Sequence, residues 1–368
     1  MKKHLKIFGY AWHIAHQYSI ITAFPEYNFY YIKNQIKNWN EENRPIPKNL
    51  FFVDHYEPGE YDLAILHVDQ QCLYGDHKGV PYRAMNEQIT DIPKIVINHG
   101  TPHFAGKEPE VLKEEMRKLI GDNTMIVNSK EAWREWGFGR YIIHGISASD
   151  FKPAEKKINR IITTIREEAN NPKQDGWQEY HNREFFHKVK EKIELIHIGQ
   201  DIRCKSYEEY RQYLAESLIC FNPTRHSPMP RSRTEAMLAG CVVVSTPYHD
   251  WDDYIINGKN GFLISGDDVD EAVEILKWLR RNPEKAAKIG LEGRKTAMYY
   301  FSPERFRADW IKLIQETLDG KIVGREVKEL KKQIEDLVYL IPGAKENRHW
   351  KAILERTLEV FSKKIRRI

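Results

Sequence analysis

The stretch Ile219–Thr246 constrains the fold of this chain more than any other part of the sequence. The apolar run Leu218–Phe221 is typical of a strand, and the apolar run Cys241–Val244 is typical of a buried strand. Between them, a polar loop leads into a short helix that begins at Glu235 and is ended by Gly240. A strand, a loop, a helix and a second strand within about thirty residues predict a βαβ unit, and therefore a parallel sheet.

The loop of this unit has a composition that suits an anionic ligand. It contains three prolines and four basic side chains, which are Pro223, Pro228, Pro230, Arg225, His226, Arg231 and Arg233. In open parallel sheets, ligands bind at the carboxyl ends of the strands, where this loop and the start of the helix are expected to lie. A helix N-terminus with arginines beside it suits a phosphate group.

The rest of the chain alternates between apolar runs and helical patterns. In the first half, the predicted strands are Leu5–Tyr10, Phe51–Val53, Leu63–Val68, Lys94–Asn98 and Thr124–Asn128, and the predicted helices are Ala15–Phe24, Glu108–Ile120 and a segment capped by Ser129. After a predicted linker at Tyr141–Pro153, strands are predicted at Arg160–Ile165 and Glu194–Ile198, and helices at Trp177–Lys192, Tyr207–Glu216, Asp268–Arg280 and Pro283–Tyr299. A last helix of this series starts at Ser302 and runs to Leu318. This alternation predicts an α/β fold with doubly wound parallel sheets.

The composition indicates a globular protein with a well-charged surface. The chain has 368 residues, 41% hydrophobic and 30% charged, and is long enough for two domains with separate cores. Its net charge of +4 is compatible with anionic ligands and too small to indicate nucleic-acid binding by itself. The four cysteines are scattered without metal or disulfide spacing, and no apolar stretch has the length of a membrane span. We therefore expect a cytoplasmic protein.

Several residues of the central stretch resemble the donor-site signature of family 4 of the glycosyltransferases, which have the GT-B fold. The matching residues are Pro223-Thr224, Glu235-Ala236-Met237, Gly240 and Val242–Val244. The family signature has two acidic positions: Glu235 matches the second, and Ser227 stands in place of the first. The segments Asn128–Lys130 and His144–Pro153 are similar to those that connect the two domains of these enzymes.

This resemblance implies a GT-B architecture, in which two Rossmann-like parallel-sheet domains face a cleft. The expected domains are an acceptor-side domain at 1–150, a nucleotide-sugar donor domain at 151–300, a crossover helix at 301–318 and a helical extension at 319–368. The extension has two apolar helical stripes that need a partner surface. The body of the protein, a homodimer partner and, because the tail is basic, peripheral contact with a membrane stay open as alternatives.

The resemblance also assigns roles to four residues. Glu235 is expected to bind the ribose of the donor, because a carboxylate at a helix start can accept hydrogen bonds from two vicinal hydroxyls. Arg166 and Lys173 are expected to hold the diphosphate and to neutralise the charge that develops on it, without a metal ion. His99 follows a buried strand and is expected to lie against the donor sugar; the alternative is a histidine that bonds its own loop.

Further residues are expected around the donor with less specific chemistry. These are Ser227, Met229, Pro230, Arg231 and Thr234, which precede the predicted helix. Arg231 either binds the diphosphate or an acidic sugar, or is an exposed loop arginine. The remaining candidates are Gly9 at the end of the first strand, Arg203 where the base is expected, and His13, His16 and Asp69, which either line an acceptor pocket or are ordinary polar positions.

Together these observations predict a retaining glycosyltransferase that uses a UDP- or GDP-sugar, with no metal and no further cofactor. A glycan, glycolipid or polysaccharide is the expected acceptor. Two alternatives stay open, because a fold alone does not determine an activity. One is a glycosyltransferase that modifies a base of DNA. The other is a non-catalytic protein that binds a nucleotide sugar or a carbohydrate, which Ser227 in place of an acid motivates.

Overall fold

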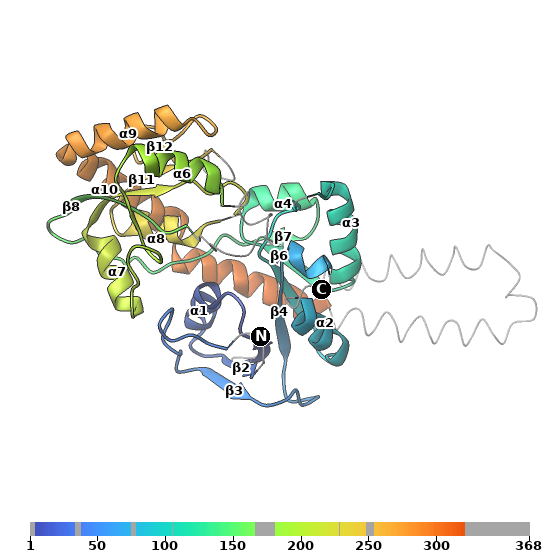
Figure 1. Cartoon of the computed structure of the whole chain (residues 1–368). Helices are drawn as coiled ribbons and strands as arrows, with labels where there is room; N and C mark the ends of the chain where they lie inside the picture. The colour runs from blue at the N-terminus through green and yellow to red at the C-terminus, as the bar shows by residue number, and fades with distance from the viewer. Residues whose placement is uncertain are drawn as a thin grey trace, which may run out of the picture. The chain divides into compact units, whose positions relative to one another are not determined.

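The computed structural model describes residues 4–33, 38–74, 79–104, 106–165, 181–227, 229–247 and 254–320 (Figure 1). The chain divides into two compact units. One unit, Lys2–Trp310, holds two β-sheets with their helices, and the other consists of Met1 and Ile311–Ile368. Residues 303–320 are helical, and the Ser302 hydroxyl caps this helix as predicted, accepting a hydrogen bond from the Arg305 amide at 3.2 Å.

The first sheet has seven strands in the order β3-β2-β1-β4-β5-β6-β7 (Figure 1), and each neighbouring pair is parallel. The strands are β1 (Lys6–Tyr10), β2 (Asn28–Ile32), β3 (Leu50–Val53), β4 (Leu63–Val68), β5 (Lys94–Asn98), β6 (Thr124–Val127) and β7 (Arg140–Tyr141). β4 is buried along its whole length, because parallel strands in the middle of such a sheet are covered on both faces.

The helices of this half pack on the sheet. They are α1 (Ile14–Ala23), the 3-10 helix η1 (Gln70–Tyr74), α2 (Gly79–Gln88), α3 (Pro109–Ile120) and α4 (Lys130–Trp136). One core cluster joins Leu112 of α3 and Trp136 of α4 to Leu66 of β4. The predicted cap of α4 is confirmed: the Ser129 hydroxyl accepts a hydrogen bond from the Ala132 amide at 3.0 Å.

The second sheet has five parallel strands in the order β12-β11-β10-β8-β9. The strands are β8 (Ile158–Thr163), β9 (Ile196–His197), β10 (Ser217–Asn222), β11 (Val242–Ser245) and β12 (Phe262–Leu263), and the helices are α6 (Arg183–Lys192), α7 (Tyr207–Glu216), α8 (Arg231–Leu238), α9 (Val269–Arg281) and α10 (Pro283–Tyr300). Val242 and Val244 pack in the core with α6 and α9, whereas Val243 packs in the core with α8 and α10. Because alternate residues of a strand point to opposite faces, both faces of this sheet are covered, and the predicted doubly wound α/β fold is confirmed.

The predicted βαβ unit is formed by β10, α8 and β11, in which Ile219 pairs with Val242. Its helix begins at Arg231, four residues before the predicted start at Glu235. The predicted start is wrong because α8 is buried on all sides from Arg233 onward, so no amphipathic period marks where it begins. Gly240 ends the helix with φ +74°, a conformation that glycine adopts without strain.

Five of the described elements are not apparent from the sequence: β2, η1, α2, β7 and β12. β2 lies in an aromatic stretch without clear alternation, α2 contains the weak helix formers Gly79 and Pro81, and β12 has two residues. The predicted helix Trp177–Lys192 corresponds to α6, which begins at Arg183. Residues 166–180 lie outside the described part of the chain.

Both sheets contain a point at which the strand order reverses. In the first sheet the chain runs outward from β1 to β2 and β3, and then returns to β4 on the other side of β1. In the second sheet, β9 follows β8 on one side, and β10 follows on the other. Ligand sites of open parallel sheets lie at the carboxyl ends of the strands beside such a reversal. The segments after β1, β4 and β5, and those after β8, β9 and β10, are therefore where a site is expected.

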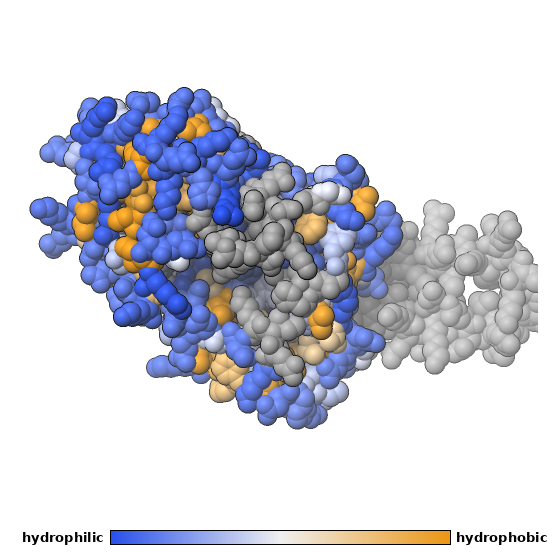
Figure 2. All heavy atoms as spheres, in the orientation of Figure 1, coloured by the Kyte–Doolittle hydropathy of each residue, from blue (hydrophilic) through white to orange (hydrophobic). Residues whose placement is uncertain are grey.

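Among the described residues, no helix has both the length and the apolar character needed to cross a bilayer. On the face drawn in Figure 2, hydrophilic residues predominate and hydrophobic residues form smaller groups between them. The predicted helical extension at 319–368 lies outside the described residues from 321 onward, so its two apolar stripes and their partner surface stay a prediction.

Candidate functional site

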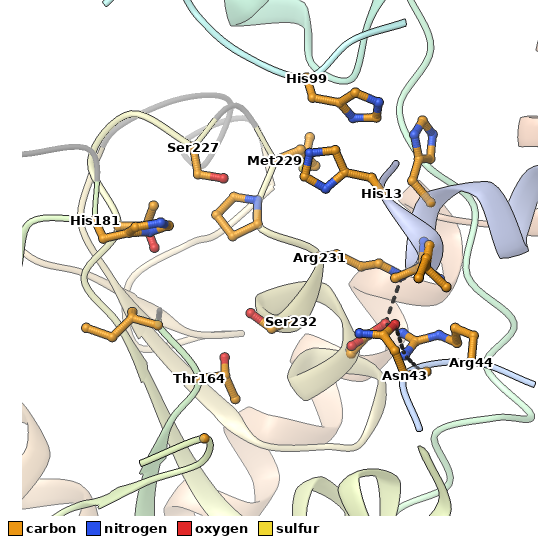
Figure 3. Close-up of a pocket in the computed structure, with 18 of the residues that line it drawn as sticks. His13, Asn43, Arg44, His99, Thr164, His181, Ser227, Met229, Arg231 and Ser232 are labelled. Atoms are coloured by element: carbon orange, nitrogen blue, oxygen red, sulfur yellow. Dashed lines mark hydrogen bonds and ion pairs between the residues drawn. The ribbon is translucent and has the colours of Figure 1, made fainter. Parts of the chain in front are cut away.

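A cavity of about 840 Å³ lies where the strand ends of both sheets meet. The first sheet lines it with residues that follow β1, β4 and β5, and the second with residues that follow β8, β9 and β10, among them His13, Asp69, His99, Thr164, Gly199 and Thr224. Figure 3 shows His13 and His99 on one side of the cavity and Thr164 and Ser232 on another. A pocket of this size accommodates a ligand as large as a nucleotide derivative.

Glu235 lies on α8 beside this cavity and is 2% exposed. Its Oε1 accepts hydrogen bonds from Arg44 Nη2 at 2.5 Å and from Arg231 Nε at 2.8 Å, and its Oε2 accepts one from the Tyr210 hydroxyl at 2.8 Å. Burial and, after it, the Glu235 carboxylate raise the pKa of Tyr210 well above its ordinary value, so the phenol keeps the proton that it donates. The Glu235 carboxylate, which is the predicted ribose ligand, thus accepts hydrogen bonds from three side-chain donors.

Arg44 is a functional candidate that sequence reasoning missed. It lies in the segment between β2 and β3, is 4% exposed, and its guanidinium packs 3.9 Å from the centre of the Tyr207 ring. Burial opposes the charge of this guanidinium, and the Glu235 carboxylate raises the pKa of Arg44 above its ordinary value. A lone arginine in a polar, asparagine-rich segment carries no local signal of such a contact.

Arg231 is the first residue of α8 and is largely buried, so it is not an exposed loop arginine. Besides its bond to Glu235, it donates from Nη2 to the Ser19 hydroxyl of α1 at 2.8 Å. Burial lowers the pKa of Arg231, against the opposing effect of Glu235. Its Nη1 is buried with no hydrogen-bond partner among the described residues.

His99 lies at the end of a buried hydrogen-bonded chain. The Gln17 amide nitrogen lies 2.9 Å from His67 Nε2, and His67 Nδ1 lies 3.0 Å from His99 Nε2. Gln17 is oriented by the Trp12 amide, which donates to its Oε1 at 2.7 Å, and by the Tyr10 carbonyl, which accepts from its Nε2 at 2.7 Å. Gln17 Nε2 also donates to the Tyr31 hydroxyl at 3.0 Å, and the Asn128 amide nitrogen lies 3.4 Å from His99 Nδ1, so both ring nitrogens of His99 have polar neighbours.

Three further histidines, His13, His16 and His144, also line the cavity. The ring of His13 lies 4.2 Å from that of His99, and the ring of His16 lies 5.5 Å from it. Burial, with a smaller contribution from Arg231, lowers the pKa of His16 to about 3, and both of its ring nitrogens are without a hydrogen-bond partner among the described residues. His144 Nε2 lies 3.1 Å from the Thr234 hydroxyl, and burial lowers the pKa of His144 well below its ordinary value.

Most of the other predicted site residues lie around the cavity. Those that line it are Ser227, Met229, Pro230, Arg203, His13, His16 and Asp69. Thr234 is fully buried behind it against His144, and Gly9 lies inside β1, one residue before its end, where it pairs with β2 and β4. Neither Thr234 nor Gly9 is among the described residues that line the cavity. Gly9 therefore forms part of the sheet and not of the loop that follows it.

Arg166 and Lys173 lie outside the described residues. Thr164 and Ile165, which directly precede Arg166, line the cavity. In the part of the chain that the structure describes, no group of three or more His, Cys, Asp or Glu side chains is arranged to hold a metal ion.

Comparison with known proteins bears on both halves of the site. Residues 182–296 match the family model described as glycosyl transferases group 1. No curated protein matches the chain. Similar solved structures are a sucrose-phosphate synthase from Thermosynechococcus elongatus (13% identity, TM-score 0.60, 85% of this chain and 98% of that one) and the Anabaena protein HepE in complex with UDP and glucose (13%, 0.61, 85% and 100%). A glycosyltransferase from Rickettsia africae is also similar (11%, 0.55, 86% and 99%).

The fold is GT-B. At sequence identities this low, structural similarity shows the fold alone, which is an architecture of two parallel-sheet domains. With the family match, the GT-B fold supports a glycosyltransferase. The matched segment contains Glu235 and α8, whereas Arg44 and the histidines of the first sheet lie outside it. The family match thus covers the side of the cavity formed by the second sheet, and the side formed by the first sheet is supported by the similarity of fold alone.

Proposed function

We propose that this protein is a retaining, metal-independent glycosyltransferase that moves a sugar from a UDP- or GDP-sugar to an acceptor hydroxyl. The observation that carries the proposal is the buried carboxylate of Glu235, located on α8 beside the cavity, within the segment that matches the glycosyl transferases group 1 model. The similar HepE structure, which contains UDP and glucose, supports a uridine nucleotide as the first donor to test.

The donor is proposed to lie along the ends of the second sheet. Glu235 would accept hydrogen bonds from the ribose hydroxyls, and the diphosphate would lie toward β8, where Thr164 and Ile165 lead into Arg166. Arg166 and Lys173 are proposed to neutralise the charge that develops on the departing diphosphate. Fixed cations in a water-excluded site stabilise such charge strongly, which removes the need for a metal ion.

His99 is proposed to lie against the donor sugar from the first sheet. In support of this role, His99 lines the cavity, where His67 Nδ1 lies 3.0 Å from its Nε2 and the Asn128 amide nitrogen lies 3.4 Å from its Nδ1. In the proposed reaction, the bond between the anomeric carbon and the phosphate oxygen breaks, and its electrons pass to the nucleoside diphosphate. The acceptor oxygen bonds to the same face of the sugar, and its proton passes to the departing phosphate, so that no separate base is needed.

The proposal is tested by incubating the protein with a panel of UDP-, GDP- and ADP-sugars, with and without EDTA, and by measuring release of the nucleoside diphosphate. We expect one donor to be hydrolysed slowly, and transferred faster once a matching glycan, lipid or polysaccharide acceptor is added. The anomeric configuration of the product, measured by NMR, tests retention. Nucleotide binding without turnover across a broad acceptor panel would instead favour a non-catalytic binding protein.

Single substitutions separate the proposed roles. Arg166→Ala and Lys173→Ala should each lower kcat by about a hundredfold or more, because one preorganised charge contact is typically worth that much. A kcat unchanged in both variants would contradict the diphosphate assignment.

A further inference from the structure

Arg44 connects the loop after β2 to the carboxylate on which the proposed function depends. Its guanidinium donates to Glu235 Oε1 at 2.5 Å and packs on Tyr207 of α7 (Figure 3 shows it beside Asn43 and near Arg231). We propose that Arg44 occupies the place of the donor ribose in the empty protein, and that nucleotide-sugar binding requires Arg44 to leave Glu235. The inference rests on the proposed function and adds to it a residue that competes with the donor.

The hydrogen-bonding capacity of Glu235 leads to this conclusion. An ionised carboxylate offers about four acceptor positions, two on each oxygen. Among the described residues, Arg44 and Arg231 occupy both positions of Oε1, and Tyr210 occupies one of Oε2. One position is left, whereas a ribose bound through two vicinal hydroxyls needs two. At least one of the three protein donors must therefore move when the ribose binds.

Of the three donors, Arg44 is the one that the structure leaves able to move. Arg231 belongs to the same helix as Glu235 and is held at its other end by Ser19. Tyr210 lies in α7, beside α8 in the same sheet domain. Arg44, in contrast, lies in residues 38–49, which contain no helix or strand, and its main ties in that loop are to Asn43 and Trp39.

The charges of the cluster also favour the exchange. Two guanidinium groups, of Arg44 and Arg231, surround the single carboxylate of Glu235, so the buried group carries one positive charge in excess. When Arg44 leaves, Glu235 keeps Arg231 as a partner, and no carboxylate is left buried without a compensating charge. The departing guanidinium regains its hydration, which offsets part of the lost ion pair. Arg44 can therefore be exchanged for the donor at Glu235.

The experiment compares the affinity for UDP and GDP of the wild type, Arg44→Ala and the matched control Arg211→Ala by isothermal titration calorimetry. Arg211 packs on the same Tyr207 ring, at 5.0 Å, but does not contact Glu235 among the described residues. A residue that blocks the site about nine-tenths of the time weakens the observed affinity about tenfold. We expect Arg44→Ala to bind the preferred nucleotide about tenfold more tightly than the wild type, and Arg211→Ala to bind it as the wild type does.

A double-mutant cycle adds a second readout. In a Glu235→Gln background, Arg44→Ala should no longer tighten binding, because the two residues act on the same contact. Arg44→Lys, which keeps the charge, should lie between the wild type and Arg44→Ala. If Arg44→Ala binds the nucleotide as weakly as the wild type or more weakly, Arg44 positions Glu235 or contacts the donor, and the inference is overturned. If neither the wild type nor any variant binds a nucleotide, the proposed function itself fails.

Discussion

His67 Nδ1 lies 3.0 Å from His99 Nε2, and this bond fixes which nitrogen of His99 faces its remaining partners. Replacing His67 by Leu removes the bond and lets the His99 ring turn. Because a misplacement of about 1 Å at a reacting centre can cost about a hundredfold in rate, we expect kcat to fall about tenfold to a hundredfold, with a smaller change in donor KM. His67→Gln, which can still hydrogen-bond, should recover part of kcat. Steady-state kinetics with the identified donor measure kcat and KM of both variants. If His67→Leu keeps the wild-type kcat, the proposed role of His99 at the donor sugar is contradicted.

Glu235→Gln keeps the shape of the side chain and removes its charge. Hydrogen bonds to a charged group contribute about 1.5–3 kcal/mol, so we expect the affinity for UDP or GDP to fall about tenfold to a hundredfold. The control is Glu216→Gln at the end of α7, whose carboxylate pairs with Arg160 and is partly exposed. Calorimetric titration of both variants tests the ribose assignment, which an unchanged dissociation constant in Glu235→Gln would refute.

The buried His16 makes stability depend on pH in a definite direction. Its pKa is about 3 in the folded protein and about 6.5 in the unfolded chain, so between these values the unfolded state alone takes up a proton. The free energy of unfolding should therefore decrease as pH falls below 6.5, by about 2 kcal/mol between pH 7 and pH 5 for this residue alone. His144, with a lowered pKa, acts in the same direction.

Urea unfolding at pH 7 and pH 5 measures this effect in the wild type and in His16→Gln. The variant should lose about 2 kcal/mol less than the wild type over that interval. An equal loss in the two proteins would mean that His16 is not held neutral in the folded state.

Gly290 of α10 packs directly on the turn that follows α8. A Cβ at this position would lie against the Gly240 carbonyl oxygen, closer than van der Waals contact allows. Gly290→Ala should therefore lower the free energy of unfolding by about 1–3 kcal/mol, although alanine favours a helix more than glycine does. In the control Gly320→Ala, the added methyl meets nothing within 4 Å, and no loss of stability is expected. Thermal unfolding compares the two, and a Gly290→Ala variant as stable as the wild type would show that α10 can shift.

The sequence predicts the central strands well and the site only in part. Leu63–Val68 and Lys94–Asn98 match β4 and β5 residue for residue, because strands covered on both faces are continuous apolar runs. The same burial makes α8 hard to delimit, since a helix covered all round has no polar face to mark its start.

The parts of the site that sequence reasoning misses depend on contacts between distant residues. Arg44 and Glu235 are separated by 191 positions, and no local pattern relates a polar loop to a helix so far along the chain. His67 lies near the end of an otherwise apolar strand, where its type alone does not reveal that it contacts His99, the residue that follows the neighbouring strand. Glu235 and His99 could be predicted as cavity residues from the sequence, because His99 directly follows a recognisable strand and Glu235 follows a recognisable proline-rich loop.

The two sheets are contiguous in sequence, and this sets the order in which they can form. β1 to β7 come from residues 6–141, and β8 to β12 come from residues 158–263. During synthesis, the first sheet can therefore assemble on the ribosome before any strand of the second has emerged. A late step joins the later part of the chain to the earlier one: Arg307 donates to Glu26 at 2.7 Å, and this contact must await the helix at 303–320. A nascent chain thus carries the strands of the first sheet well before α8 and Glu235, which lie on the other side of the cavity, have emerged.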